Sequence, residues 1–380
     1  MATGYKGFNP QAFARTSATT LAKHIRDVEE AMLRNFQLGA LLESNGRISY
    51  DMGGEGFDWP VQYRNHNVEG NTGENPRNFA RRNLWQTASL EFRGYQTTDA
   101  MYLREFLSNR GPEAIVKVYD NFTTRLETSM KQALGTQYYI DGTTAANSQA
   151  WHGLESLFGI NGTLNISTGA QRSANAADKV GYPSQTYAGL STVLGNYGGE
   201  NESGQVWPEG IADPEFDFWS PLVINYTSTA FGGAADTFAA QGDEAMRYGR
   251  IHAERNSSMD GQVTNVSLSR NLYMDFLNLI DAKEQINVNR GDGNSLVSLG
   301  FKNVVNFDGM EVSYENGVPT NVGYGYNIKS MELLSMDSQL FRSEGPEYDL
   351  DTQSFRAVIS TLSNMKCTSP RNFFKLAALA

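Results

Sequence analysis

The chain opens with a polar stretch, 1–18, and then shows apolar residues at helical spacing across 20–42. Asn45-Gly46 follows this segment and is a stop signal for a helix. The apolar residues recur every three or four positions, as on one face of an α-helix, and they are Leu21, Ile25, Val28, Met32 and Phe36. The pattern predicts an N-terminal arm and helix over 1–45.

Between 46 and 96 the pattern changes to alternation with little clustering of apolar residues. Ala88, Leu90 and Phe92 alternate with polar residues, as in a strand with one polar face. Pro60 suits an edge strand, because proline cannot donate to a ladder of hydrogen bonds. We therefore expect a long two-stranded ribbon. Such a ribbon is unstable alone in water, so we expect neighbouring copies of the chain to support it.

The clearest helix of the chain is predicted at 112–134, after a shorter predicted helix at 99–107. Pro112 lies at its first turn, Glu113 is favourably placed near the positive end of its dipole, and Gly135 can end it. One apolar stripe at spacings of three and four forms its packing face, and the stripe contains Ile115, Tyr119, Phe122, Leu126 and Met130.

The second half of the chain alternates between helical and strand patterns. Residues 147–233 have the Gly, Asn and Ser content of loops that join short strands. Helices are predicted near 236–253 and at 270–281, with a buried strand at 262–268 between them, which is typical of a small α/β domain. Strand-like segments separated by turns complete the chain, so the fold class is α+β.

Composition excludes several classes of protein. The formal net charge of −11 has the wrong sign for a general nucleic-acid binder, although 1–24 carries only basic charges. No apolar run is long enough to span a membrane, and no hydrophobic signal core opens the chain. A single cysteine, Cys367, rules out an internal disulfide framework and suits a reducing cytoplasm.

No motif in the sequence indicates catalysis or metal binding. The four histidines are scattered, and no nucleophile elbow or phosphate-binding loop is present. Residues 287–294 resemble a calcium loop, but Ser298 stands where a bidentate Glu is required, so we interpret the segment as a turn. Asp349 and Asp351 are interpreted as surface charge rather than as an acid/base pair. We expect no cofactor, no metal and no enzymatic activity.

In order along the chain, these parts resemble a tailed-bacteriophage major capsid protein of the Hong Kong 97 fold. The resemblance covers nearly the whole chain and depends on the order of its parts more than on signature residues. It is carried by 59–64 and 79–95 as legs of an extended loop, 111–134 as a spine helix, and 299–319 and 355–376 as later strands.

The resemblance implies four parts and a shell-forming function. They are an N-terminal arm and helix (1–45), an extended β-loop (46–96), a peripheral domain with the spine helix (97–148 and 333–380) and an axial α/β domain (149–332). Such subunits form hexamers and pentamers of an icosahedral shell, the capsid of the virion, around double-stranded DNA. A net-acidic subunit suits a shell that must not bind its DNA tightly.

The sequence departs from the family's founding phage, which joins a loop lysine covalently to an asparagine of a neighbour. No lysine lies between Lys23 and Lys117, and guanidinium is a very poor nucleophile. We therefore predict a non-covalent shell, held by arginine–carboxylate pairs and apolar contacts from the loop. The predicted inter-subunit residues are Trp59, Arg64, Arg77, Arg81, Arg82 and Trp85.

The resemblance also implies partners, and two alternatives stay open. No long helical prefix precedes the arm, so we expect a separate scaffolding protein, together with a portal and decoration proteins. One alternative is an encapsulin-like compartment shell, which would hold a cargo enzyme instead of nucleic acid. The other is a β-rich carbohydrate-active enzyme, suggested by 18 Tyr and 5 Trp, which would be a monomer with a cleft.

Overall fold

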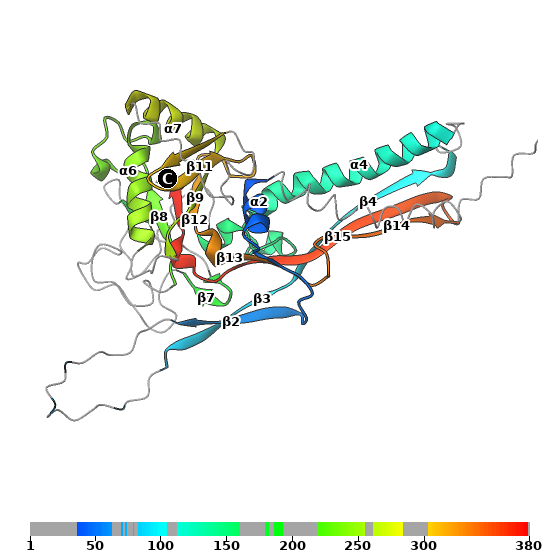
Figure 1. Cartoon of the computed structure of the whole chain (residues 1–380), viewed down its shortest axis with the longest axis horizontal. Helices are drawn as coiled ribbons and strands as arrows, with labels where there is room; N and C mark the ends of the chain where they lie inside the picture. Colours follow the sequence, from blue (N-terminus) through cyan, green and yellow to red (C-terminus); the bar gives the residue numbers. More distant parts are fainter. Residues whose placement is uncertain are drawn as a thin grey trace, which may run out of the picture.

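The computed structural model gives, over the described residues, a mixed α+β fold with two large sheets, a two-stranded ribbon, a short hairpin of β6 (Thr186–Tyr187) and β7 (Leu190–Ser191), and one long helix (Figure 1). The helix and three strands run together away from a body that holds the second sheet and two shorter helices (Figure 1). No described helix is long and apolar enough to cross a membrane. The structure describes residues 36–62, 70, 73, 79, 83–104, 112–159, 179–181, 186–192, 219–254, 261–283 and 303–378.

The first sheet is organised around β15, its longest strand. β15 pairs antiparallel with β4 along one edge and with β13 and β14 along the other. The parallel pair of β1 with β13 completes the sheet. Its five strands are β1 (Ile48–Ser49), β4 (Arg93–Tyr102), β13 (Met331–Ser335), β14 (Arg342–Asp349) and β15 (Ser354–Cys367).

Helix α4 (Pro112–Gln137) covers one face of this sheet. Leu126, Met130 and Leu134 recur at a spacing of four residues and are each at most 2% exposed. They share a core with Phe355 and Ile359, which point to the same face of β15 because strand side chains alternate. The predicted stripe residues Ile115, Tyr119 and Phe122 lie in α4, but their side chains are outside the described residues.

The prediction that Gly135 ends this helix was wrong. α4 continues through Gly135 to Gln137. A β-carbon at Gly135 would lie 2.6 Å from the Phe36 ring, and one at Gly317 would lie 1.7 Å from the Gly135 carbonyl oxygen. Gly135 is therefore needed for close packing inside a helix, which sequence spacing alone does not distinguish from a helix end.

The second sheet is mixed and has seven strands, with α6 (Phe238–Ala253) and α7 (Arg270–Lys283) packed on it. This arrangement confirms the predicted strand and its two flanking helices. The strand order is β10 (Val304–Phe307), β11 (Met310–Tyr314), β9 (Asn265–Leu268), β12 (Gly323–Tyr326), β16 (Phe374–Ala377), β8 (Leu222–Asn225) and β5 (Val180–Gly181).

The last strand corrects the expected division of the chain. β16 pairs with β12 and β8 inside the second sheet and has no place in the first. The expected peripheral range of 333–380 is therefore too long at its C-terminal end. β15 leads through the short helix η6 (Pro370–Asn372) into β16, so the end of the chain crosses from one sheet to the other.

Among the described residues, the ribbon consists of β2 (Gly56–Gln62) and β3 (Trp85–Glu91). The segment after Phe92 continues as β4, so the prediction of a helix beginning at Asp99 was wrong. One continuous stretch of chain thus pairs first with β2 and then with β15. Asp99 and Met101 lie on the face of β4 that packs against α4, where Asp99 pairs with Arg125. Local helix propensity cannot anticipate this contact between distant segments.

The predicted N-terminal helix is described only at its end. α2 (Gln37–Ser44) begins after Phe36, which is extended, so the predicted helix does not run unbroken through Phe36. The stop signal is confirmed, since Asn45 caps the helix and Gly46 adopts a left-handed conformation. The rest of 20–42 and the calcium-like segment 287–294 lie outside the described residues.

Candidate functional site

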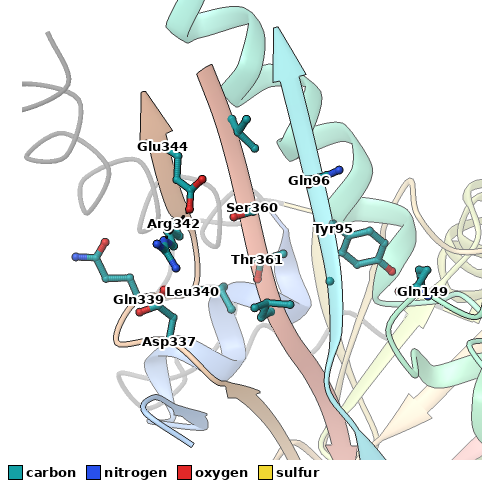
Figure 2. Close-up of a pocket in the computed structure, with 13 residues that line it drawn as sticks. Tyr95, Gln96, Gln149, Asp337, Gln339, Leu340, Arg342, Glu344, Ser360 and Thr361 are labelled. Atoms are coloured by element: carbon teal, nitrogen blue, oxygen red, sulfur yellow. Dashed lines mark ion pairs between the residues drawn. The ribbon is translucent and has the colours of Figure 1, made fainter. Parts of the chain in front are cut away.

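The face of the first sheet opposite α4 is uncovered by the described chain, and we call it the open face. It carries the outward residues of three strands, such as Gln96 on β4, Ser360 on β15 and Arg342 on β14 (Figure 2). A groove of about 510 Å³ crosses it. The groove is lined by Gly94, Tyr95, Gln96, Gln149, Asp337, Gln339, Leu340, Arg342, Glu344, Val358, Ser360, Thr361 and Leu362.

The open face combines apolar and charged groups. Leu362 is 49% exposed at one end of the groove. Arg342 and Glu344 form an ion pair at 3.1 Å while each keeps more than half of its side chain exposed (Figure 2). Asp337 lies beside them and Glu347 follows on β14. Exposed pairs contribute about 0–1 kcal/mol to stability, so these charges are available to another partner.

Asp349, at the far end of β14, stabilises the turn into β15. Its carboxylate accepts hydrogen bonds from the Asp351 amide and the Thr352 hydroxyl and pairs with Arg356 at 2.6 Å. The Thr352 hydroxyl bond, together with the other donors, lowers the pKa of Asp349 below its usual value. Asp349 and Asp351 therefore share a turn and do not form an acid/base pair.

The inner face of the ribbon rests on its own chain. Trp59 is 7% exposed, stacks near Phe57 with ring centroids 6.0 Å apart, and has the Lys366 ammonium 5.4 Å from its ring centroid. The Ser89 amide also donates to the Ala188 carbonyl. Contacts within the subunit therefore support β2 and β3, and support of the ribbon by neighbouring copies stays a prediction.

The two tryptophans predicted as inter-subunit contacts have different environments. Trp59 already has neighbours within its own subunit, whereas Trp85 is 54% exposed on the outer face of the ribbon. Arg64, Arg77, Arg81 and Arg82 lie outside the described residues. A contact of any of these six side chains with a neighbour stays a prediction.

Asn364 of β15 connects the first sheet to the end of the ribbon at Glu91. Its Oδ1 accepts from the amides of His152 and Met365, at 2.9 and 2.8 Å, and its Nδ2 donates to the Glu91 carbonyl at 2.6 Å. Nδ2 also lies 2.9 Å from Nδ1 of His152. Burial lowers the pKa of His152 to about 4, so the neutral ring can accept this bond at neutral pH. One of these four hydrogen bonds thus joins Glu91, the last residue of β3, to β15 of the first sheet, and the other three hold the Asn364 side chain in place.

We expect Asn364→Leu to loosen this attachment. Leucine removes all four hydrogen bonds and leaves buried amides and a carbonyl without partners, so the free energy of unfolding should fall by about 2–4 kcal/mol. Hydrogen exchange should accelerate in 56–62 and 85–91 before it does so in α6. Asn303→Leu, at an exposed asparagine, is the control. Unchanged exchange in the ribbon would contradict this role of Asn364.

Two buried carboxylates connect the long-helix side of the molecule to the second sheet. Glu155, on the short helix η2 (Leu154–Leu157), pairs with Lys375 of β16 and accepts from the Tyr324 hydroxyl of β12. Glu315, after β11, accepts from the Tyr139 hydroxyl at 2.6 Å and the Gln37 amide at 3.2 Å. Burial raises the pKa of each carboxyl to about 7.

Neither of these carboxylates belongs to a metal-binding cluster of described residues. Among the described residues, no group of three or more His, Cys, Asp or Glu could hold a metal ion. Cys367 is buried, and burial raises the pKa of its thiol, so it is a poor nucleophile. Sequence reasoning missed Asn364, Glu155 and Lys375. The signal for Lys375 was a single lysine within the apolar run of β16.

Comparison with known proteins places this geometry among phage capsids. No family model and no curated protein matches the sequence. The structure is similar to a chain of the cyanophage A-1(L) capsid asymmetric unit, with a TM-score of 0.54 and 16% identity over 100% of this chain and 97% of that chain.

Two further capsid structures are more distant. One is the capsid of a native GTA particle (TM-score 0.48, 9% identity, 90% of each chain). The other is the mature capsid of bacteriophage PhiM1 (TM-score 0.44, 11% identity, 88% of this chain and 86% of that chain). All three similar structures are capsid structures. The whole-length similarity to the cyanophage chain shows that this protein has the fold of a phage capsid subunit.

Proposed function

We propose that this protein is the major capsid protein of a tailed bacteriophage. Copies of it assemble into hexamers and pentamers of an icosahedral shell that encloses double-stranded DNA, in the host cytoplasm and with a scaffolding protein. The observation that carries the proposal is the similarity to the cyanophage capsid chain over the full length of both chains. It is supported by the two-stranded ribbon and by the long helix that runs outward from the body together with strands of the first sheet (Figure 1).

In this proposal, three parts of the structure are assigned to parts of such a subunit. The first sheet with α4 corresponds to a peripheral domain, and the second sheet with α6 and α7 to an axial domain. The ribbon corresponds to the base of an extended loop. A portal protein and decoration proteins are further interaction partners of the shell in this proposal.

We propose that the open face receives the loop of a neighbouring copy. The segment between β2 and β3 carries Arg64, Arg77, Arg81 and Arg82, and no lysine or acidic side chain accompanies Arg77, Arg81 and Arg82 within 77–83. The open face offers Asp337, Glu344 and Glu347 as carboxylates, with apolar surface at Leu362. Bidentate arginine–carboxylate pairs give geometric specificity to such a contact.

The direct test is to express the chain with its scaffolding protein and to examine the product by sedimentation and electron microscopy. Closed shells that contain nucleic acid support the proposal. A monomer would contradict it, and shells filled with a cargo enzyme would favour a compartment shell.

The shell should be non-covalent. Because no loop lysine is available for an amide bond, boiling purified particles in detergent should release chains of 42.0 kDa. Denaturing electrophoresis measures this directly. The same particles before boiling serve as the control for assembly. A ladder of multimers that persists after boiling would show that another pair of residues forms a covalent link.

A further inference from the structure

A small polar pocket lies at the N-terminus of α7, away from the open face. Its volume is about 220 Å³. One wall is the start of the helix and the other is the loop that follows β11. The lining residues are Ser269, Arg270, Asn271, Glu315, Asn316, Val318 and Thr320.

Ser269 is a buried donor without a partner. The residue is 2% exposed, and its hydroxyl forms no hydrogen bond with the described residues. Its carbonyl accepts the amide of Tyr273, so Ser269 immediately precedes the first turn. A serine at this position ordinarily caps the helix by accepting an amide of the first turn. Here the hydroxyl has no such bond among the described residues, and Ser269 is one of the residues that line the pocket.

The start of α7 adds further donors. The first amides of any helix lack intrahelical carbonyl partners, and the helix dipole places positive partial charge at this end. α7 has 14 residues, which is long enough for the helix dipole to be fully developed at its N-terminus. Arg270 is held over the pocket by a 2.8 Å bond from its guanidinium to Asn316 Oδ1, and the guanidinium has other N–H groups free to donate.

Glu315 is the one acidic group of the lining. Its oxygens accept from Gln37 and Tyr139 on the side away from α7. The titratable groups that act on it are Tyr138 and Tyr139, which follow α4, and Tyr326 on β12, while Arg270 is a further lining residue of the pocket. Burial raises the pKa of each of these tyrosines, so they are neutral between pH 6 and 8.

We propose that this pocket binds a small inorganic oxyanion such as sulfate or phosphate, held by Ser269, Arg270 and the first amides of α7. Such a site goes beyond the proposed shell function and does not depend on it. Helix N-termini that combine free amides with a nearby cation are suited to tetrahedral anions. Bound anion would stabilise the folded subunit, because only the folded chain forms the site.

Binding should strengthen as the pH falls. Burial raises the pKa of Glu315 to about 7, so its carboxyl is mostly neutral at pH 6 and mostly ionised at pH 8. An ionised carboxylate repels the anion. Sulfate keeps both of its charges over this range. Its affinity should therefore be roughly fivefold higher at pH 6 than at pH 8, for a moderate effective dielectric.

The test is isothermal titration of the purified full chain with sodium sulfate, at constant ionic strength set with sodium chloride. Saturable binding that is tighter at pH 6 than at pH 8 is the expected result. Arg270→Gln should abolish the binding, and Glu315→Gln should make it independent of pH. Arg125→Gln, at an exposed arginine of α4, is the control and should bind sulfate as the unaltered chain does.

Ser269→Ala separates an anion site from a merely structural serine. Since the hydroxyl has no hydrogen-bond partner among the described residues, the variant should melt in chloride at the same temperature as the unaltered chain. It should lose most of the increase in melting temperature that sulfate produces. Failure of the unaltered chain to bind sulfate, or equal binding by Arg270→Gln, would overturn the proposal, whether or not the protein forms shells.

Discussion

Lys375→Met should destabilise the subunit by about 3–5 kcal/mol, the cost of leaving a buried charge without its partner. Lys375 and Glu155 are each about 1% exposed and form an ion pair that joins β16 to η2. Methionine keeps most of the side-chain volume but removes the ammonium. Denaturation of the soluble subunit with urea, followed by circular dichroism, measures the loss.

The loss should be larger at pH 8 than at pH 5. Burial raises the pKa of Glu155 even with Lys375 present, and removal of the ammonium takes away its main opposing influence. A carboxyl whose folded pKa is raised destabilises the fold as the pH rises through that value. At pH 5 the variant can protonate Glu155 and avoid most of the penalty.

A double variant isolates the charge. Lys375→Met with Glu155→Gln keeps a polar partner for the Tyr324 hydroxyl and has no buried charge, so it should recover most of the lost stability. The control is Arg342→Met, which breaks an exposed pair and should cost about 0–1 kcal/mol. Equal losses from Lys375→Met and Arg342→Met would show that the buried pair is not important for stability.

The second large effect concerns assembly. Arg81→Ala with Arg82→Ala should fold normally but lower the yield of particles on the order of tenfold or more. Each exposed ion pair is worth only about 0–1 kcal/mol, but every subunit of a closed shell repeats the contact. Unfolding midpoints establish normal folding, and sedimentation measures the yield. Arg125→Ala is the matched control, because Arg125 pairs with Asp99 in its own chain.

Charge reversal tests where these arginines bind. Glu344→Arg with Glu347→Arg should reproduce the assembly defect if the open face receives the loop. Combining this variant with Arg81→Glu and Arg82→Glu should restore particles, because the attraction is re-formed with opposite signs. Particles at the normal yield from either double variant alone would remove the open face from the contact.

Local patterns predicted much of the fold. The strand and helices of the second sheet and the stop at Asn45-Gly46 follow from signals within a few residues of each position. The absence of a loop lysine is likewise readable from sequence alone. The errors occurred where distant partners decide conformation. Asp99–Tyr102 is a strand because β15 lies beside it, and Gly135 stays helical because Phe36 and Gly317 pack against it.

The candidate sites divide in the same way. The sequence by itself determined the ribbon, the long apolar stripe and the order of parts that resembles a phage capsid protein, since periodicity and turn signals are local properties. Only the tertiary structure decided that Trp59 faces its own subunit, that Asn364 holds the ribbon, and that Ser269 and Arg270 line one pocket with Glu315. These contacts join residues far apart in the chain, and no local pattern records which distant group will satisfy a buried donor, acceptor or charge.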